Sequence, residues 1–421
     1  MKKIREGYKM TELGEIPGDW EVETLNSIID KDRKITYGIV QPGEYDDKGV
    51  YIIRAKDYSF GWVKNDSIFK ANQEIEKSYA RARVKKGDIL LTIVGSVGNL
   101  AIVPKRLNNA NITQQTARLA FDVNKANNIF YYNFLMSDIA LKEIKRYMKN
   151  GVQPSLNLSD VEKFKVVVPS IREQEKIASI LSSVDEQIDN VDGLIEKNKE
   201  LKKGLMQQLL TKGIGHTKFK KTDIGEIPEE WEVKRLDLIG EIVTGSTPKT
   251  SEKDNYGDEY LWVSPGDLGI KKYVTNTVKM LSHKGFSKTR KLPKGAILVT
   301  CIGSTIGKMG ISRSELSTNQ QINSIICNEN INSEFIYYAL NYNFKMYTSF
   351  ISTQAVPIIN KTTFGEFLIQ IPSIQEQTKI ALILSELDKK IEEYGNRKEK
   401  LEELKKGLMQ QLLTGKMRLS K

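Results

Sequence analysis

Two long segments of the chain carry apolar residues at intervals of three and four positions. This spacing gathers the apolar side chains into a narrow stripe along one side of a helix, a surface suited to packing against another helix. Each pattern ends at a glycine, Gly213 and Gly415. The spacing therefore predicts two helices of about 40 residues, roughly 60 Å long at the usual rise of 1.5 Å per residue. The stripes consist of Ile177, Leu181, Val184, Ile188, Val191 and Ile195 in the first segment, and Ile380, Leu384, Leu387, Ile391 and Tyr394 in the second.

Both helical patterns begin with the same start signal. Ser170 is followed three residues later by Glu173, and Ser373 by Glu376. This is a capping box, in which the Ser side chain accepts from an early backbone N–H and the Glu reaches back to the N–H of the Ser. Two capped helices of equal length, too long for the core of one domain, favour a coiled coil that joins two bodies.

The chain is a tandem duplication. The twelve residues from Glu200 to Thr211 recur letter for letter as Glu403 to Thr414, at the end of the second helical pattern. The stretch from Gly14 to Trp20 is likewise echoed from Gly225 to Trp231. Each unit is expected to hold an opening hairpin-like segment, then strands, then a long helix.

Matched strand and loop signals lie inside each unit. The buried-strand pattern at Ile89–Thr92 leads into a glycine loop, as does the pattern at Ile297–Thr300. A polar strand is predicted to carry Thr113, Gln114 and Gln115, and another Asn319, Gln320 and Gln321. A short aromatic helix and a final strand close each block. We interpret the fold as α+β: two similar globular domains, with a mixed or bent sheet, joined by two long antiparallel helices with approximate two-fold symmetry. The expected segments are 1–168, 169–213, 214–371 and 372–421.

Composition excludes several classes of protein. Of the 421 residues, 39% are hydrophobic and 28% charged, which is ordinary for globular domains, and the longest apolar runs are strand-sized. No membrane segment or export signal is indicated, so a cytoplasmic location is expected. With only two Cys and two His, the chain lacks the material for a disulfide scaffold or a zinc site.

The net charge of +11 lies mainly outside the helices. Residues 170–213 carry 7 Lys/Arg and 8 Asp/Glu, and residues 373–421 carry 11 and 8, which leaves about nine positive charges for the globular blocks. A basic surplus on paired domains indicates a polyanion such as nucleic acid. Moderately basic proteins are also common, so charge alone leaves both interpretations open.

Catalytic motifs are missing. The loop from Gly303 to Met309 resembles a phosphate-binding loop, but it is one residue short and Met309 replaces the metal-binding Ser or Thr, while its twin near Gly95 has no Lys. A tight loop that approaches a neighbour or a DNA phosphate explains both copies. Nuclease, methyltransferase and dinucleotide-binding motifs are absent, so we expect no catalytic centre and no cofactor bound by this chain.

Over nearly its full length the chain resembles the specificity subunits of type I restriction–modification systems. The resemblance rests on Gly-Glu-Ile-Pro-x-x-Trp at the head of each half, the Lys-Gly-x-Ile-Leu…Gly-Ser loop, Pro-Ser-Ile-x-Glu-Gln before each helix and the repeated tail. It implies two target-recognition domains that each read half of a split double-stranded DNA sequence, and helices that act as a ruler. It also implies two methyltransferase subunits and restriction (translocase–nuclease) subunits as partners, with S-adenosylmethionine, ATP and magnesium used by those partners.

The candidate residues follow from position in the repeats. Gln is a plausible bidentate reader of adenine, although inward structural amides explain the Gln pairs as well. Candidates for facing DNA are Tyr37, Arg54, Gly95, Ser96, Gln114, Gln115, Thr247, Gly303, Ser304, Gln320 and Gln321. Candidates for docking partners are Lys202, Lys203, Gln207, Gln208, Lys405, Lys406, Gln410 and Gln411. The alternatives are a fused methyltransferase or nuclease chain, which the absent motifs disfavour, and a coiled-coil scaffold, which the charge on the globular blocks disfavours.

Overall fold

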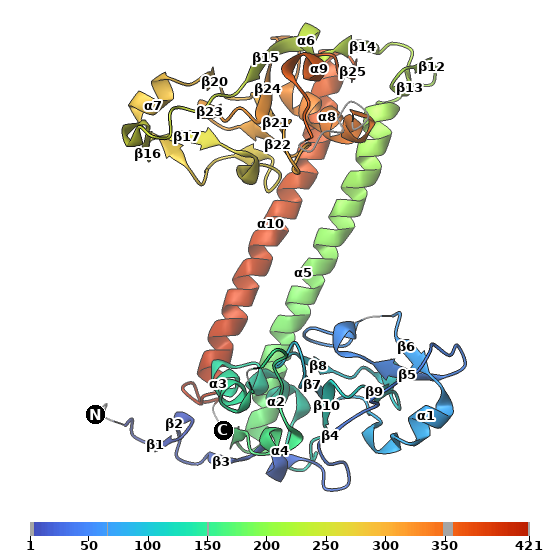
Figure 1. Ribbon diagram of the computed structural model, residues 1–421, viewed down its shortest axis with the longest axis vertical. Coiled ribbons are helices and arrows are strands. Elements are labelled where there is room, and N and C mark those ends of the chain that lie inside the picture. The colour runs from blue at the N-terminus through green and yellow to red at the C-terminus, as the bar shows by residue number, and fades with distance from the viewer. Residues whose placement is uncertain (1–3, 65, 150, 348–356, 420–421) are drawn as a thin grey trace. The chain divides into compact units, whose positions relative to one another are not determined.

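The computed structural model describes residues 4–64, 66–149, 151–347 and 357–419. The chain divides into two compact units (Figure 1). Unit 1 comprises residues 1–190 and 397–421, and unit 2 comprises residues 191–396. Each unit contains a globular part and one half of each long helix. The segment boundaries expected from the sequence, which set the helices apart, remain a prediction.

The strands of unit 1 form a hairpin and several small sheets. β1 and β2 pair as the predicted opening hairpin, and β3 pairs antiparallel with β11. The other two sheets have the orders β4-β10-β7-β8 and β6-β5-β9, the latter with a parallel pair. The strands are β1 (Tyr8–Thr11), β2 (Gly14–Pro17), β3 (Glu21–Thr24), β4 (Thr36–Tyr37), β5 (Val50–Ile53), β6 (Phe69–Ala71), β7 (Ile89–Thr92), β8 (Leu100–Ile102), β9 (Asn111–Ile112), β10 (Thr116–Leu119) and β11 (Lys165–Val168).

The main core of unit 1 lies between the four-stranded sheet and the long helix α5 (Ile171–Thr211). α2 belongs to this core: Phe130, Tyr131 and Phe134 are buried in one cluster with residues of β7, β10 and α5. The predicted short aromatic helix is therefore confirmed, and its aromatic side chains lie in the core. The helices of the globular part are η1 (Leu25–Ile28), η2 (Ala55–Asp57), α1 (Gln73–Lys77), η3 (Ala80–Ala82), η4 (Lys105–Leu107), α2 (Asn128–Leu135), α3 (Asp138–Tyr147) and α4 (Leu158–Val161).

Unit 2 repeats this plan with larger sheets. Its hairpin is β12–β13, β14 pairs with β25, and two five-stranded sheets have the orders β15-β24-β21-β22-β18 and β16-β19-β17-β23-β20. The strands are β12 (Phe219–Thr222), β13 (Gly225–Pro228), β14 (Glu232–Arg235), β15 (Gly240–Thr244), β16 (Tyr256–Gly257), β17 (Tyr260–Val263), β18 (Tyr273–Val274), β19 (Met280–Leu281), β20 (Lys291–Leu292), β21 (Ile297–Thr300), β22 (Met309–Ser312), β23 (Leu316–Thr318), β24 (Ile322–Cys327) and β25 (Leu368–Ile371).

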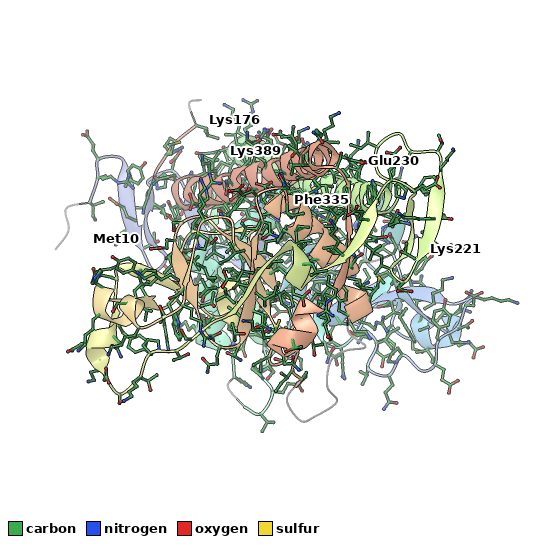
Figure 2. All side chains as sticks on the ribbon, turned by 90° about the horizontal axis from the view of Figure 1, so that it is seen from above. Met10, Lys176, Lys221, Glu230, Phe335 and Lys389 are labelled. Carbon is green, nitrogen blue, oxygen red and sulfur yellow. The ribbon has the colours of Figure 1, made fainter. Side chains whose placement is uncertain are left out.

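The core of unit 2 forms in the same way around its aromatic helix. Phe335, labelled in Figure 2, is fully buried among residues of β21 and of the helix α10 (Ile374–Leu412), whereas Lys221 and Glu230 lie at the periphery near the hairpin. The helices of the globular part are α6 (Leu236–Ile239), η5 (Lys253–Asn255), η6 (Pro265–Asp267), α7 (His283–Ser287), α8 (Ser333–Tyr347) and α9 (Lys361–Gly365).

The two long helices confirm the predicted α+β fold with antiparallel helices. α5 has 41 residues and α10 has 39. Within unit 1 the first half of α5 packs against the last half of α10, where Leu412 and Leu413 join Ile177 and Leu181 in the core. Unit 2 contains the converse pairing of Leu209 and Leu210 with Ile380 and Leu384. The stripe residues near the start of each helix are therefore buried in the two cores, whereas Ile188, Ile195, Ile391 and Tyr394 are only partly buried.

The capping boxes are only half right. Ser170 and Ser373 accept from the N–H groups of Glu173 and Glu376 at 3.3 Å, as expected. The Glu side chains do not return to the cap. Each carboxylate instead accepts the indole N–H of a buried Trp at 3.0 Å, Trp20 for Glu173 and Trp231 for Glu376. A buried indole N–H needs an acceptor, and the carboxylate that the cap would otherwise use supplies it.

The predicted polar strands are wrong. Gln114 and Gln115 lie in a turn between β9 and β10, and Gln320 and Gln321 lie in a turn between β23 and β24. The turns are closed by bonds from Thr116 N to Thr113 O and from Ile322 N to Asn319 O. At this point the chain leaves one sheet and enters the other, and the exposed backbone of such a crossing favours polar side chains.

Candidate nucleic-acid interface

The Gly-Ser loop of unit 1 is a tight connection between β7 and β8. Four buried apolar or hydroxyl residues of β7 bring the chain to the edge of the sheet, and Gly98 N donates back to Thr92 O over 3.0 Å. Gly95 and Gly98 have φ angles of 84° and 95°, a region that favours glycine. The loop therefore presents Ser96 as its exposed side chain.

Unit 2 builds the same loop between β21 and β22. Gly303 and Gly307 have φ angles of 98° and 91°, and Gly307 N donates to Thr300 O over 3.0 Å. Ser304 and Lys308 are exposed on it. The closing bonds are intramolecular and the loop is not followed by a helix N-terminus, so its geometry differs from a phosphate-binding loop.

The Gln turns lie beside the Gly-Ser loops. Ile93 N donates to Gln115 O, and in unit 2 Cys301 N donates to Gln321 O, both over 2.8 Å. Gln114 and Gln320 are exposed at the tips of the turns. The side chain of Gln321, in contrast, accepts from Asn319 Nδ2 at 3.0 Å and is a structural amide. The structural interpretation therefore holds for Gln321, and the DNA-facing interpretation of the exposed Gln114 and Gln320 stays a prediction.

The turn-rich segments complete the same edge. Tyr37 lies on β4 opposite Ala117 of β10 and its side chain is partly exposed. A Cβ on the next residue, Gly38, would lie 1.8 Å from Ile112 O, so only glycine lets the two backbones pass. Gly245 meets Asn319 O in the same way at 2.0 Å. In unit 2 the hydroxyl of Thr247 donates directly to Gln320 Oε1.

Arg54 lies near this edge but is already engaged. It follows β5, whose Ile53 pairs with Ile112 just before the Gln turn. Its guanidinium donates through two nitrogens to both oxygens of Asp57, each at 3.1 Å. A bidentate contact to a guanine would have to displace that carboxylate.

Two further residues belong to the edge and were missed from the sequence. Gln153 places its amide nitrogen next to Gly95, 3.5 Å from where a Cβ would stand. Arg290 donates to the carbonyls of Thr244 and Gly245 and holds the turn before Thr247. Both come from loops far away in the sequence, so neither spacing nor composition signals them.

The docking candidates separate into two groups. Lys202 forms an ion pair with Asp388, and its twin Lys405 with Asp185 at 2.6 Å, in each case across the two helices. The ion pairs across the helices therefore explain why both copies of the repeat carry a lysine at this position, without a partner protein. The other candidates are exposed on the helix surface: Lys203, Gln207, Gln208, Lys406, Gln410 and Gln411.

A groove in unit 1 brings several docking candidates together. It has a volume of about 760 Å³ and runs between the β1–β2 hairpin, the junction of α2 and α3, and the end of α10. Its lining includes Leu13, Met136, Lys406, Met409 and Gln410. Apolar floor and charged rim are the properties of a surface that receives a protein partner.

Residues 17–200 and 228–403 each match the family model of the type I restriction modification DNA specificity domain. The chain belongs to this family. The two matched stretches contain all the residues of the two edges described above and most of both helices.

Specificity subunits from several organisms are similar to the chain. It is 30% identical to the type I restriction enzyme MjaX specificity subunit of Methanocaldococcus jannaschii, over 98% of this chain and 97% of the relative. It is 28% identical to the MjaVIII specificity subunit of the same organism, over 98% and 96%. The crystal structure of the type I restriction-modification S subunit from M. genitalium has the same fold, with a TM-score of 0.59 at 18% identity, covering 94% of this chain and 96% of that one.

The two cysteines of this specificity-family chain are poor nucleophiles. Burial raises the pKa of Cys301 to about 12, and burial likewise raises the pKa of Cys327 to about 12. Both are protonated thiols at neutral pH, and the thiolate is the reactive form. In the described part of the chain, no three His, Cys, Asp or Glu side chains are arranged to hold a metal ion, and no helix is long and apolar enough to cross a membrane.

Proposed function

We propose that the chain is the DNA-recognition subunit of a type I restriction–modification complex, and that each unit reads one half of a bipartite double-stranded target. The observation that carries this is a duplicated edge whose backbone frame recurs while part of its side chains differ. The glycines and backbone bonds recur in both units, and so do the exposed Ser and Gln side chains. In contrast, exposed Tyr37 corresponds to half-buried Thr244, and half-buried Asn99 corresponds to exposed Lys308. A fixed frame with variable contacts suits two half-sites of different sequence.

The catalytic work is assigned to partner subunits. The chain would dock two methyltransferase subunits and, for cleavage, restriction subunits, and those partners would use S-adenosylmethionine, ATP and magnesium. A cytoplasmic setting belongs to the same proposal. Relatives named as type I specificity subunits and a fold shared with an S subunit support it.

Partner docking has independent support from two glycines. Gly204 and Gly407 lie inside the repeated tail on α5 and α10, and a Cβ on either would meet nothing within 4 Å. Glycine in a helix interior costs about 1 kcal/mol relative to Ala. No described residue comes close enough to these positions to require glycine, whereas a partner that approaches the helix backbone would.

The helices would act as spacers between the half-sites. A straight helix of 41 residues is about 60 Å long. A helix pair resists bending and twisting better than a loop, so the unread spacer of the target should have a fixed length.

Methylome mapping tests the proposal. The chain is co-expressed with a type I methyltransferase subunit, and methylated adenines are mapped across the host genome. Two short, unrelated half-sites with a constant spacer are expected, and replacing residues 222–368 with those of a relative should change one half-site only. A contiguous motif, or a swap that changes both halves, contradicts the proposal.

A further inference from the structure

A buried cluster of charged and hydroxyl groups lies in unit 2 where β18 meets α8 and α10. At its centre is Lys272, whose side chain is 9% exposed. Its ammonium lies 3.1 Å from Glu334 Oε2 on α8, 2.8 Å from Ser385 Oγ on α10 and 3.2 Å from the hydroxyl of Tyr338. Three partners satisfy the three N–H groups of the lysine, so a charge that burial would penalise is fully compensated.

The cluster extends to the second long helix. Tyr338 donates its hydroxyl to Asp388 on α10 over 2.5 Å, and the other oxygen of Asp388 accepts from Lys202 on α5. Tyr273 of β18 donates to Glu334. A continuous path of hydrogen bonds therefore runs from β18 through α8 to both helices, and its two cations balance its two carboxylates.

The protonation states fit this network. Burial by itself would raise the pKa of Glu334, but hydrogen bonds from Ser385 and Tyr273 and the charge of Lys272 lower that pKa overall. Burial and the neighbouring Asp388 raise the pKa of Tyr338, so its phenol stays protonated and serves as a donor. Such fully satisfied buried networks favour one arrangement of the groups they connect.

Unit 1 has the same frame without the cluster. Ile311 N donates to Lys272 O at 2.7 Å, and Ile102 N donates to Gly61 O at 2.8 Å, which makes Gly61 the counterpart of Lys272. The aromatic helices α2 and α8 are aligned by their caps, Asn127 and Asn332. That alignment sets Ile129 opposite Glu334 and Asn133 opposite Tyr338.

The substitutions are coordinated. Unit 1 has no counterpart of Lys272, and it also lacks counterparts of Glu334 and Tyr338. The helix residues are the same in both units, because Ser182 and Asp185 of α5 correspond to Ser385 and Asp388 of α10. The hydroxyl of Tyr132 takes up the N–H of Gly61 instead, over 2.6 Å. Among the described residues, unit 2 but not unit 1 therefore ties this strand to the long helices through part-buried ion pairs.

The position of β18 matters for the edge that faces the target. β18 pairs in parallel with β22, and β22 directly follows the Gly-Ser loop that presents Ser304. A shift of β18 relative to α10 would move that loop relative to the helices. The contacts of Lys272 therefore hold β18, and through β18 and β22 they also hold the candidate DNA-facing loop.

We propose that Lys272 is a positioning residue that fixes the recognition edge of unit 2 to the long helices, so that the second half-site is read in one register relative to the helical spacer. This inference rests on the proposed function. Unit 1, which lacks the cluster, would tolerate small displacements of its half-site. The chain would then have one rigidly held and one more adaptable recognition edge.

The test separates positioning from stability with a double variant. Lys272→Met alone leaves the half-buried carboxylate of Glu334 without its cation, which destabilises the fold. Lys272→Met with Glu334→Met removes both charges and keeps apolar volume, so the unit should fold. Lys271→Met is the matched control, because the adjacent Lys271 is exposed and pairs with Glu392 on the surface.

Two measurements are made on the full chain and on the complex with its methyltransferase. Hydrogen exchange of residues 272–274 and 309–312 should be about tenfold faster in the double variant and unchanged in the control. In the methylome, the double variant should methylate targets whose spacer differs by one base pair, with both half-sites unchanged. Slow exchange together with an unchanged spacer overturns the inference while leaving the proposed function intact. Absence of any bipartite target in the wild-type complex overturns the proposed function, and the exchange measurement still decides the anchoring.

Discussion

The indole N–H of Trp20 donates to Glu173 Oε2 over 3.0 Å, between residues 153 positions apart in the chain. The same carboxylate accepts from Arg418, whose guanidinium also binds Asp19. One carboxylate at the start of α5 thus ties together the opening hairpin region and the segment after α10. Unit 2 repeats the contact with Trp231 and Glu376, but His216 replaces the arginine.

Trp20→Phe should lower the free energy of unfolding of unit 1 by about 2–4 kcal/mol, because a buried carboxylate loses a donor and a small void forms. Hydrogen exchange resolved by segment is the measurement, and unit 2 should be unaffected. Trp62→Phe is the control, since Trp62 is partly exposed. Equal effects of the two substitutions would assign the loss to ring size rather than to the hydrogen bond.

A buried carboxylate in unit 1 predicts a pH dependence of stability. Glu76 is 1% exposed, and hydrogen bonding to Arg83 is the main reason that its pKa lies below the ordinary value of 4.5. Because the folded pKa is lowered, the stabilisation is fully present above about pH 4.5 and is lost as the pH falls through the folded value. Glu76→Gln should therefore flatten the acid limb of urea unfolding measured against pH. Glu74→Gln, on the exposed side of the same helix, should leave that limb unchanged.

Replacing the two glycines of the repeated tail should have opposite effects on the stability of the chain and on its assembly with the partner. Gly204→Ala with Gly407→Ala should raise the free energy of unfolding by about 1–2 kcal/mol in total, while weakening assembly with the methyltransferase. Gly193→Ala with Gly395→Ala is the control pair outside the repeated tail, where a Cβ also meets nothing within 4 Å. If assembly is as tight as before, the glycines do not mark a docking surface.

Reversing the charge of the exposed lysines in the repeated tail tests the same proposed docking surface. Lys203→Glu with Lys406→Glu should weaken assembly and leave the fold intact, because both side chains are exposed. Lys202 and Lys405 are unsuitable for this purpose, since reversing them breaks the ion pairs across the helices. Partner affinity by calorimetry and unfolding by denaturant distinguish the two effects, and unchanged affinity counts against docking here.

The exposed glutamines should act on separate half-sites. Gln114→Ala is expected to relax one half of the target and Gln320→Ala the other, each by about 1–3 kcal/mol at one base pair. Gln321→Ala serves as control, since its side chain is half-buried and bonded to Asn319, whereas Gln320 is exposed at the tip of the turn. Affinity of the complex for duplexes substituted in each half measures this, and a loss that is uniform over all sequences would indicate phosphate contacts only.

Insertion of four residues after Val191 tests the spacer. Four helical residues lengthen α5 by about 6 Å and rotate the part that follows by about 40°. α10 keeps its length, so the apolar stripes of the two helices would no longer face each other along their whole length. The insertion should change the preferred spacer length or abolish methylation. A wild-type methylome from the insertion variant would show that α5 does not set the spacing.

The spacing of apolar residues predicted the long helices, whereas the candidate site depends on contacts between residues far apart in the sequence. The spacing of Ile177, Leu181 and Val184 is sufficient to predict α5, because the apolar positions of a helix recur every three or four residues. The Gln turns were misread as strands, since alternating polar residues do not reveal a crossing between sheets. The bonds of Glu173 to Trp20 and of Lys272 to Ser385 could not be predicted, because each joins residues more than 100 positions apart.

The division of the helices between the units has a consequence for synthesis on the ribosome. Unit 2 is one continuous stretch, residues 191–396, so all its parts are available before residues 397–421 are synthesised. Unit 1 is interrupted, and its core includes Leu412 and Leu413, both fully buried. The domain that is translated first therefore waits for residues 397–421, and the second domain can complete its fold before it.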